Sequence, residues 1–305
     1  MPPRHRTHLS LHLPRRSLKL GERTLVMGVL NVTPDSFSER GVYFDRRAAI
    51  ARALEMEREG ADLIDIGGES TRPGSLPVSP EEEIERTVPV IETLRSKGLR
   101  IPISIDTTKA AVAERALLVG AEIVNDVSGL RYDPALAAVV RKHRAAIVLM
   151  HIRGAPSTMQ TIPPARQIIP SVRRGLLSSL QKALSAGIPK RRICLDPGIG
   201  FGKTLEQNFE LIAHLHRLAS LGFPLLVGPS RKSFLRKTLE SSCGPLPMPG
   251  DALLQKQGLP VPEELLFGTA AAVTACILHG AHIVRVHDVR QMLPVVRIAD
   301  QFLSL

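Results

Sequence analysis

The sequence predicts an α/β protein in which a single domain forms a (β/α)8 barrel. Its 305 residues alternate eight times between a short apolar run and a longer segment with helical character. The apolar runs are rich in Val, Ile and Leu, which is typical of strands buried on both faces of a parallel sheet. An open doubly wound sheet would need a glycine-rich dinucleotide turn after its first strand. No GxGxxG follows the first apolar run, so the barrel is favoured.

The strands of this barrel can be placed in chain order from the apolar runs. The first run, 25–32, stops at the turn sequence Thr33-Pro34-Asp35-Ser36. Seven further runs of similar character follow it. They lie at 62–67, 101–106, 122–126, 146–151, 192–196, 224–228 and 283–286.

Helices are expected between these strands. Segment 46–59 ends at Gly60, and segment 80–97 begins with Pro80 and three glutamates, which suit the first turn of a helix. Within the helix expected at 205–221, His214 and His216 are two positions apart and should not face each other. The remaining helices are expected at 109–118, 134–143, 171–186, 263–279 and 289–303, with a short one at 233–239.

Two segments fall outside the regular alternation. Residues 1–21 contain four arginines and no acidic residue, and we expect a flexible basic leader with a short strand at 17–20. Residues 240–262 are rich in Pro and Gly and are expected to form an insertion after the seventh strand. The barrel domain is therefore predicted to occupy residues 22–305.

Composition excludes several classes of protein. No run approaches the roughly 18 apolar residues of a membrane span, and Cys194, Cys243 and Cys276 form no CxxC pair. Unpaired, widely spaced cysteines suit the reducing cytoplasm. The net charge is +11, but the basic residues are scattered, there is no Trp and aromatic residues make up 3% of the chain. Single-strand nucleic-acid binders usually carry aromatic platforms, so no nucleic-acid partner is expected.

Polar side chains follow every predicted strand. In a barrel of parallel strands these ends meet at one face, where active sites form. The groups in strand order are Asn31 and Asp35; Glu69, Thr71 and Arg72; Asp106; Asn125 and Asp126; His151; Asp196; Ser230, Arg231 and Lys232; and Arg285, His287 and Asp288. One such residue could be an ordinary loop residue in water, but eight sets at equivalent positions predict a shared site.

These residues fall into two chemical classes, which predicts a site with two ends. Carboxylates and an amide suit a polar heterocycle with ring N–H and amino groups, whereas cations suit a phosphate. The first class is Asp106, Asn125 and Asp196. The second class is Arg72, Lys232, Arg285 and His287. Asn31 and Asp35 add oxygen ligands suited to a Mg²⁺ ion that bridges a phosphate.

The segment 197–204, PGIGFGKT, is close to a phosphate-binding loop but does not match it. The loop pattern needs Gly where Pro197 stands, and the dinucleotide pattern needs Gly where Lys203 stands. We interpret the segment as a turn after a strand, whose glycines let the backbone approach a ligand.

Several motifs in this order resemble those of the dihydropteroate synthase family. They are NVTPDSFS (31–38), GGESTRPG (67–74), SIDT (104–107), NDVSG (125–129), DPGIGFGK (196–203), GPSRKSF (228–234) and RVHDV (285–289), together with Met150-His151, Gly154, Met159-Gln160 and Gly268-Thr269. The resemblance covers about residues 24–290. One departure is Glu39-Arg40, where the family more often has Asp-Gly.

The resemblance implies a pterin-binding barrel enzyme, a transferase of alkyl or aryl groups other than methyl. It would condense 6-hydroxymethyl-7,8-dihydropterin pyrophosphate with 4-aminobenzoate and release pyrophosphate, with Mg²⁺ as cofactor, sulfonamides as competitors and a homodimer as the assembly. The implied pterin residues are Asp106, Asn125, Val127, Met150, Asp196, Phe201, Gly228 and Lys232. The implied pyrophosphate residues are Asn31, Arg72, Arg285 and His287, with Mg²⁺ on Asn31 and Asp35. The implied 4-aminobenzoate residues are Phe37, Thr71, Arg72, Pro73, Phe201, Lys232 and Ser233, and the implied catalytic residues are Asp106, Asp196, Lys232, Arg285 and His287.

Two alternatives remain open from the sequence. A pterin-binding methyltransferase barrel would share the pterin carboxylates but has no reason to keep the STRPG and GPSRKS segments. A protein that holds a pterin without catalysis would share both segments. An assay for pyrophosphate release distinguishes the three possibilities.

Overall fold

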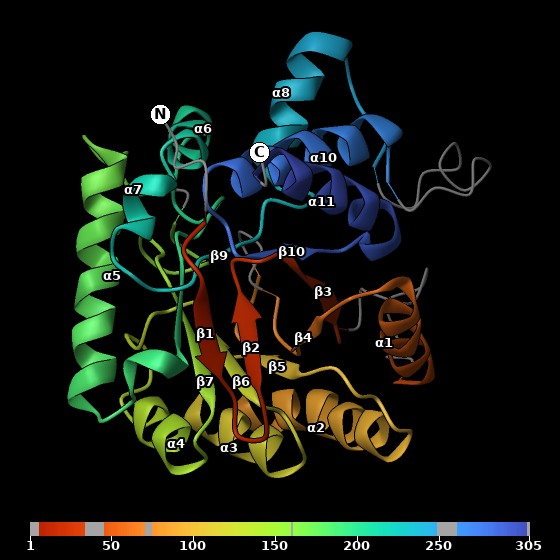
Figure 1. The fold of residues 1–305 in the computed structure, drawn as a ribbon, viewed down its shortest axis with the longest axis vertical. Coiled ribbons are helices and arrows are strands. Elements are labelled where there is room, and N and C mark those ends of the chain that lie inside the picture. The colour runs from red at the N-terminus through yellow and green to blue at the C-terminus, as the bar shows by residue number, and fades with distance from the viewer. Residues whose placement is uncertain (1–5, 34–45, 71–74, 160, 249–260, 304–305) are drawn as a thin grey trace.

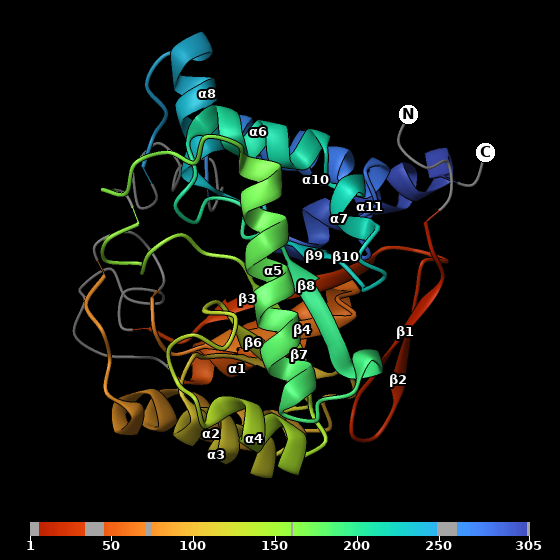
Figure 2. The same ribbon diagram turned by 90° about the vertical axis from the view of Figure 1, so that its left-hand side faces the viewer.

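The computed structural model describes residues 6–33, 46–70, 75–159, 161–248 and 261–303 of the chain. Eight parallel strands form one sheet in the order β8-β7-β6-β5-β4-β3-β10-β9. The two end strands also meet, because Leu195 pairs with Leu225 and its N–H donates to the Pro224 carbonyl at 2.9 Å. The sheet therefore closes on itself, and the predicted (β/α)8 barrel is confirmed (Figures 1 and 2).

The strands of the barrel agree closely with the apolar runs of the sequence. They are β3 (Leu25–Asn31), β4 (Leu63–Gly67), β5 (Ile103–Asp106), β6 (Ile123–Asp126), β7 (Ala146–Met150), β8 (Ile193–Asp196), β9 (Leu226–Val227) and β10 (Ile283–Val286).

Helices surround the sheet on its outer side (Figure 1). The first turn of α2 is capped by Ser79, whose Oγ accepts from the Glu82 N–H at 3.1 Å. Thr204 and Gln207 form a reciprocal capping box at the start of α6. The helices are α1 (Arg46–Glu59), α2 (Pro80–Ser96), α3 (Ala110–Leu118), α4 (Leu136–Lys142), α5 (Ile168–Ser185), α6 (Leu205–Ala213), α7 (His216–Ala219), α8 (Ser233–Cys243), α10 (Glu263–Leu278) and α11 (Val289–Leu303), with a 3-10 turn η2 (Lys190–Arg192). None of these described helices is long and apolar enough to cross a membrane.

Two helix predictions need correction. The segment expected as one helix, 205–221, is divided into α6 and α7 at His214 and Leu215. This break brings the rings of His214 and His216 to 6.0 Å between centroids, so the expectation that they do not face each other is wrong. The short helix expected at 233–239 continues to Cys243 as α8 and occupies the start of the predicted insertion 240–262. Residues 249–260 of that insertion lie outside the described residues.

The barrel interior consists of apolar layers below a polar layer. Alternate residues of each strand point inward, so the inner positions near the strand starts carry Leu25, Met27, Leu63, Ile123, Ala146, Val148, Cys194, Leu226 and Ile283. Toward the carboxyl ends of the barrel strands, polar or small residues join the inward-facing Val29 and Met150. These polar or small residues are Asn31, Asp65, Asp106, Asn125, Asp196, Gly228 and Arg285. The apolar layers thus make a packed floor that supports the polar groups at the carboxyl ends of the strands.

An antiparallel hairpin closes the barrel at the opposite end from these polar groups (Figure 2). The expected strand at 17–20 is present as β2 (Ser17–Leu20), and it pairs with β1 (Leu9–His12), which the sequence did not lead us to expect. Leu11, Leu13 and Leu20 pack against the apolar floor. Ahead of β1, the buried Arg6 donates to Asp300 of α11 at 2.6 Å and to the Ala281 carbonyl at 2.8 Å. The described part of the basic leader, from residue 6, is therefore held against the barrel.

Candidate active site

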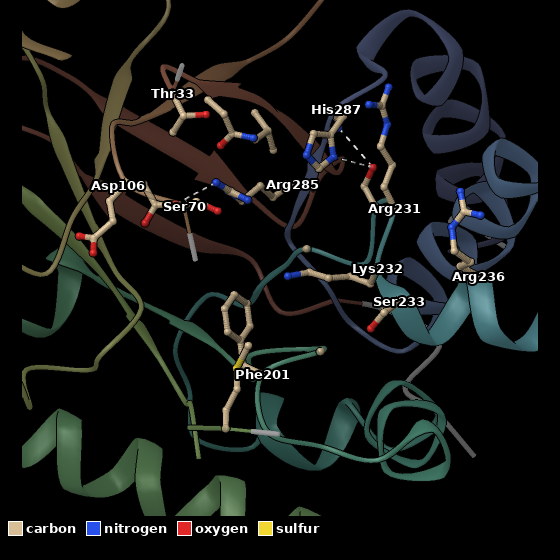
Figure 3. Close-up of a pocket in the computed structure, with 17 residues that line it drawn as sticks. Thr33, Ser70, Asp106, Phe201, Arg231, Lys232, Ser233, Arg236, Arg285 and His287 are labelled. Atoms are coloured by element: carbon tan, nitrogen blue, oxygen red, sulfur yellow. Dashed lines mark hydrogen bonds and ion pairs between the residues drawn. The ribbon is translucent and has the colours of Figure 1, made fainter. Parts of the chain in front are cut away.

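A cavity of about 510 Å³ opens at the carboxyl ends of the barrel strands (Figure 3). Its walls come from residues far apart in the sequence, from Val29 on β3 to His287 after β10. Eleven of the residues predicted for the site line it. They are Asn31, Glu69, Asp106, Phe201, Gly228, Ser230, Arg231, Lys232, Ser233, Arg285 and His287. Polar side chains from several strand ends therefore share one site, as the sequence predicted.

A narrower slot adjoins this cavity and descends toward the apolar floor. All eight residues predicted to hold a heterocycle line this slot: Asp106, Asn125, Val127, Met150, Asp196, Phe201, Gly228 and Lys232. Ile199 and Arg285 complete its walls. Val127, Met150 and Phe201 also belong to a small apolar cluster with Ile152 and Met159. The slot thus presents apolar faces and polar groups together, which suits a flat heteroaromatic ring.

Asp106 and Asp196 are the two carboxylates of the slot, and burial raises the pKa of both. The pKa of Asp106 rises to about 8 because it is enclosed and lies near Asp65. The pKa of Asp196 rises less, to about 6, because its Oδ1 accepts from the Gly198 N–H at 2.7 Å and Lys232 lies nearby. Asp106 therefore holds a proton more tightly than Asp196 does, and the two groups can play different parts toward one ligand.

Lys232 reaches into the slot over an aromatic ring. Its ammonium lies 4.0 Å from the centroid of the Phe201 ring, within the range of a cation–π contact. Burial and the nearby Arg285 lower its pKa to about 8. Figure 3 shows the Lys232 side chain above Phe201 and Ser233 at the wall beside it.

Arg285 connects the slot with the wider cavity. Its Nη2 donates to Asp106 Oδ2 at 3.0 Å, and its Nε donates to Asp65 Oδ2 at 2.6 Å. Asn125 Nδ2 donates to that same Asp65 oxygen at 2.9 Å. Arg285 was expected on the anion side of the site, but it also lines the slot.

At the mouth of the cavity, His287 is held by its neighbour Ser230. The Ser230 Oγ lies 3.2 Å from His287 Nδ1 and accepts from the His287 N–H at 3.3 Å. Arg231 turns its guanidinium to the buried Asp288, with Nε at 3.0 Å from Oδ2. In Figure 3 the Arg231 side chain accordingly extends away from Lys232 and Phe201. Of these strand-end groups, His287 presents its ring to the cavity, and Asp288 serves to position the loop.

Two other polar groups at strand ends also have structural roles. Both oxygens of Asp126 accept backbone N–H groups, from Ser128 at 2.8 Å and from Leu130 at 2.6 Å, which shapes the loop after β6. His151 is buried, and its pKa is lowered to about 2 by burial and by nearby cations, so it remains neutral. Neither residue lines the cavity or the slot.

The glycine-rich segment after β8 folds as a turn around Lys203. The ammonium of Lys203 donates to the carbonyls of Gly198, Phe201 and His151 at 2.6, 3.0 and 3.2 Å. Gly198 has φ of 70°, and a Cβ there would lie 2.0 Å from the His151 carbonyl oxygen. This turn places Phe201 against Lys232, which agrees with the interpretation of the segment as a ligand-facing turn.

Comparison with known proteins supplies the family. A model of pterin-binding enzymes matches residues 27–287. The dihydropteroate synthase of Synechocystis is 48% identical over 280 residues, which are 92% of this chain and 90% of the relative. This chain belongs to the dihydropteroate synthase family.

Two solved structures of that family superimpose closely on this barrel. The dihydropteroate synthase of Xanthomonas albilineans, with 4-aminobenzoic acid, has a TM-score of 0.82 at 38% identity and covers 98% of this chain and 100% of its own. The Yersinia pestis dihydropteroate synthase, in a sulfonamide drug complex, has a TM-score of 0.82 at 37% identity, with 97% and 99% covered. The fold and the family therefore agree, and the chain is an enzyme of this class.

Five residues predicted for the site lie outside the described part of the chain: Asp35, Phe37, Thr71, Arg72 and Pro73. Their nearest described neighbours, Thr33 and Ser70, both line the cavity. The segment that follows β4 is secured at its start. Arg86 donates to the Gly68 carbonyl at 2.7 Å, and Glu69 forms an ion pair with Lys109, which also pairs with the buried Glu83 at 2.5 Å.

Asp65 is the main residue that the sequence analysis missed. The search considered polar residues after each strand, whereas Asp65 lies within β4, where it is fully buried. The alternation in Leu63-Ile64-Asp65-Ile66 could have identified it, because Leu63 is an inner residue and period two places Asp65 inward as well. A charged residue at an inner position of a barrel strand indicates a site group.

Proposed function

We propose that this protein condenses 6-hydroxymethyl-7,8-dihydropterin pyrophosphate with 4-aminobenzoate, giving 7,8-dihydropteroate and pyrophosphate in folate biosynthesis. One observation carries the proposal: a narrow slot lined by Asp106, Asn125 and Asp196 is continuous with a wider cavity lined by Arg285 and His287. Membership of the dihydropteroate synthase family supports the same reaction.

The slot residues would hold the pterin ring. Asp196, whose pKa is about 6, is ionised at neutral pH and can accept from ring N–H and amino groups. Burial and the nearby Asp65 raise the pKa of Asp106, which favours its protonated form, and in that form it can both donate and accept. Asn125 would complete the polar edge, and Met150 and Val127 would pack on the ring faces.

The cavity side would carry the leaving group. The bond between the pterin methylene carbon and the pyrophosphate oxygen breaks, and the amino nitrogen of 4-aminobenzoate forms a new bond to that carbon and then loses a proton. Negative charge grows on the departing pyrophosphate, and Arg285, His287 and Lys232 are placed to stabilise it. No covalent intermediate with the enzyme is required.

Mg²⁺ suits the anion side of this site. Asn31 ends β3 and lines the same cavity as Arg285 and His287, and Asp35 follows four residues later, outside the described residues. No group of three or more His, Cys, Asp or Glu residues among the described ones could hold a metal. Mg²⁺ commonly binds through one or two protein oxygens, substrate phosphates and water, so a site with few protein ligands is consistent with Mg²⁺. The ion would supply positive charge to the pyrophosphate.

The arylamine would enter beside Lys232, Phe201 and Ser233, which line the wall of the cavity. Phe37, Thr71, Arg72 and Pro73 complete this proposed subsite, and Arg72 also contributes to the pyrophosphate side. Sulfonamides resemble 4-aminobenzoate in shape and would compete with it for this subsite, in keeping with the sulfonamide complex of the Yersinia pestis relative.

We also infer a cytoplasmic homodimer. The three cysteines are unpaired, which suits a reducing compartment. Phe267 on α10 and Ile298 and Phe302 on α11 expose their apolar side chains, and the two helices lie side by side (Figure 1). Light scattering on the purified protein should give twice the mass of one chain.

The decisive experiment is an assay of pyrophosphate release. We expect release when the pterin pyrophosphate, 4-aminobenzoate and Mg²⁺ are all present, and a sharp fall when 4-aminobenzoate is omitted. If the folded protein binds the pterin but releases no pyrophosphate, it is a pterin-binding protein without this activity. Methyl transfer from a methylated folate without pyrophosphate chemistry would assign it to the methyltransferase barrels.

A further inference from the structure

We propose that Asp65 is a positioning residue that couples the two halves of the site, because it holds a pterin-slot residue and the leaving-group cation at the same time. The proposal rests on the proposed function, since it assigns Asn125 to the pterin and Arg285 to both the slot and the pyrophosphate side. Asp65 itself lines neither the cavity nor the slot, so it acts through these two partners.

One oxygen of Asp65 makes both connections. Asp65 Oδ2 accepts from Asn125 Nδ2 at 2.9 Å and from Arg285 Nε at 2.6 Å. Asp65 is fully buried, and its strand neighbours Ile64 and Ile66 pack on the outer side of the sheet. A carboxylate enclosed in this way has few rotamers available, so its two partners are held at a fixed separation.

Arg285 is held by two contacts that differ in what a ligand would do to them. Asp65 does not line the slot, so a ligand in the slot would not compete for the Nε–Asp65 contact. The Nη2–Asp106 contact, at 3.0 Å, uses a side chain that lines the slot. A pterin that hydrogen-bonds to Asp106 competes with Nη2 for that oxygen. Asp65 would then keep the Arg285 guanidinium in place while the Nη groups of Arg285 become available to the pyrophosphate.

This arrangement predicts positive coupling between the two ligands. When the pterin ring takes over Asp106, Arg285 loses one carboxylate partner and gains free donors beside the cavity, so an anion binds more tightly. Linkage requires the converse, that the anion strengthens pterin binding by the same factor. The coupling depends on Asp65, because without this anchor Arg285 could follow Asp106 or the anion independently.

The charge of Asp65 also acts on Asp106. The groups that shift the pKa of Asp106 are Asp65 and Glu83, which raise it, and Arg285 and Lys232, which lower it. Replacing Asp65 by a neutral residue removes a raising influence, so the pKa of Asp106 should fall. A residue with only a packing role would leave the pH profile of kcat/KM unchanged, and this difference separates the two roles.

The test compares Asp65→Asn with Asp62→Asn. Asp62 is a matched control at the start of the same strand, paired with Arg23 and accepting from the Val26 N–H at 2.9 Å, away from the cavity. Calorimetry would measure 6-hydroxymethylpterin with and without pyrophosphate and Mg²⁺. We expect the wild type to bind the pterin several-fold more tightly with pyrophosphate, and Asp65→Asn to lose this gain and about tenfold in kcat/KM. Asp62→Asn should keep both within about twofold.

Each outcome is decisive. Coupling retained in a folded Asp65→Asn, with an unshifted pH profile, would make Asp65 a packing residue and overturn the proposal. Independent binding of both ligands to the wild type would also overturn it. If the wild type binds neither ligand, the proposed function fails instead. Should Asp65→Asn not fold, Arg285→Lys serves, because one ammonium cannot replace the two-pronged contact; retained coupling there would refute the proposal.

Discussion

Asp196 and Asp106 face the same slot, and burial raises the pKa of each by a different amount. Asp196 has a backbone N–H and cations to stabilise its charge, which limits the rise to about 6. Asp106 has a second carboxylate close by, which adds to the effect of burial and brings its pKa to about 8. Asp106 therefore binds its proton more tightly than Asp196 does, although both line the same slot.

Replacing Asp196 by Asn tests the ionised member of this pair. The amide keeps the size of the carboxylate but removes its charge and one acceptor, and charge-assisted hydrogen bonds contribute about 1.5–3 kcal/mol each. We expect the pterin to bind more than about tenfold more weakly. Calorimetry with 6-hydroxymethylpterin measures this directly, and unchanged affinity in a folded variant would remove Asp196 from the pterin site.

Replacing Asp106 by Asn should stabilise the fold, and more so as the pH rises. The folded-state pKa of Asp106, about 8, exceeds the unfolded value of 3.8. The folded state therefore binds more protons across that interval, and the stability of the wild type falls as the pH rises from about 4 to about 8. An amide does not titrate and escapes this loss. The melting temperature of Asp106→Asn should exceed that of the wild type by more at pH 8 than at pH 5. The same difference between variant and wild type at both pH values would contradict the raised pKa.

At the level of single residues, the sequence predicted the membership of the site better than the role of each member. Strand ends converge in any parallel barrel, so listing polar residues after strands identified the groups around the slot. The same rule could not separate His287, which lines the cavity, from Asp126, whose oxygens bind their own loop. That distinction depends on tertiary contacts. Asp65 was missed because it lies inside a strand.

Among the elements, the segment after β4 is anchored by a partly buried ion-pair cluster. Lys109, just before α3, pairs with Glu69 at the start of that segment and with Glu83 of α2, which is fully buried. Val78 N–H donates to the other Glu69 oxygen at 3.4 Å. Both flanks of the stretch that contains Thr71, Arg72 and Pro73 are therefore linked to one glutamate.

Lys109→Met tests this anchor. The change leaves Glu83 buried without its cation, which should cost about 2 kcal/mol of stability. It should also raise KM for 4-aminobenzoate more than KM for the pterin pyrophosphate, because the proposed arylamine residues follow Glu69. Lys109→Arg should restore much of both. Lys142→Met is the matched control, since the Lys142–Glu114 pair is exposed. Equal effects on both KM values would indicate a general loss of stability.

Element boundaries were predicted correctly where local sequence signals set them. They were predicted wrongly where tertiary packing sets them. Pro80 and the glutamates after it mark the start of α2, and the structure begins the helix there. The break between α6 and α7 has no glycine or proline to announce it. β1 was missed because four residues, Leu9–His12, show a strand pattern only when β2 and the barrel floor are known.

For the whole molecule, the β1–β2 hairpin closes one end of the barrel, and the candidate active site lies at the other end. Leu11 and Leu20 are almost completely buried against the apolar floor, and the polar layer with Asp65 and Asn125 begins above it. The hairpin therefore contributes to the stability of the barrel and is separated from the slot by packed side chains. Stability and substrate binding should respond independently to changes at this end.

Leu11→Ala tests this separation. Removing a buried leucine side chain leaves a cavity in the floor and should lower the free energy of unfolding by about 2–4 kcal/mol. KM for both substrates should stay within about twofold at a temperature where the variant is folded, because the hairpin packs on the apolar floor and none of its residues lines the slot. Leu118→Ala provides the matched control, since Leu118 is 63% exposed and its loss should change stability by under about 0.5 kcal/mol. Urea unfolding and steady-state kinetics measure the two quantities. A rise in KM that accompanies the loss of stability would mean that the floor transmits strain from the hairpin to the polar layer, and that the two ends of the barrel are mechanically coupled.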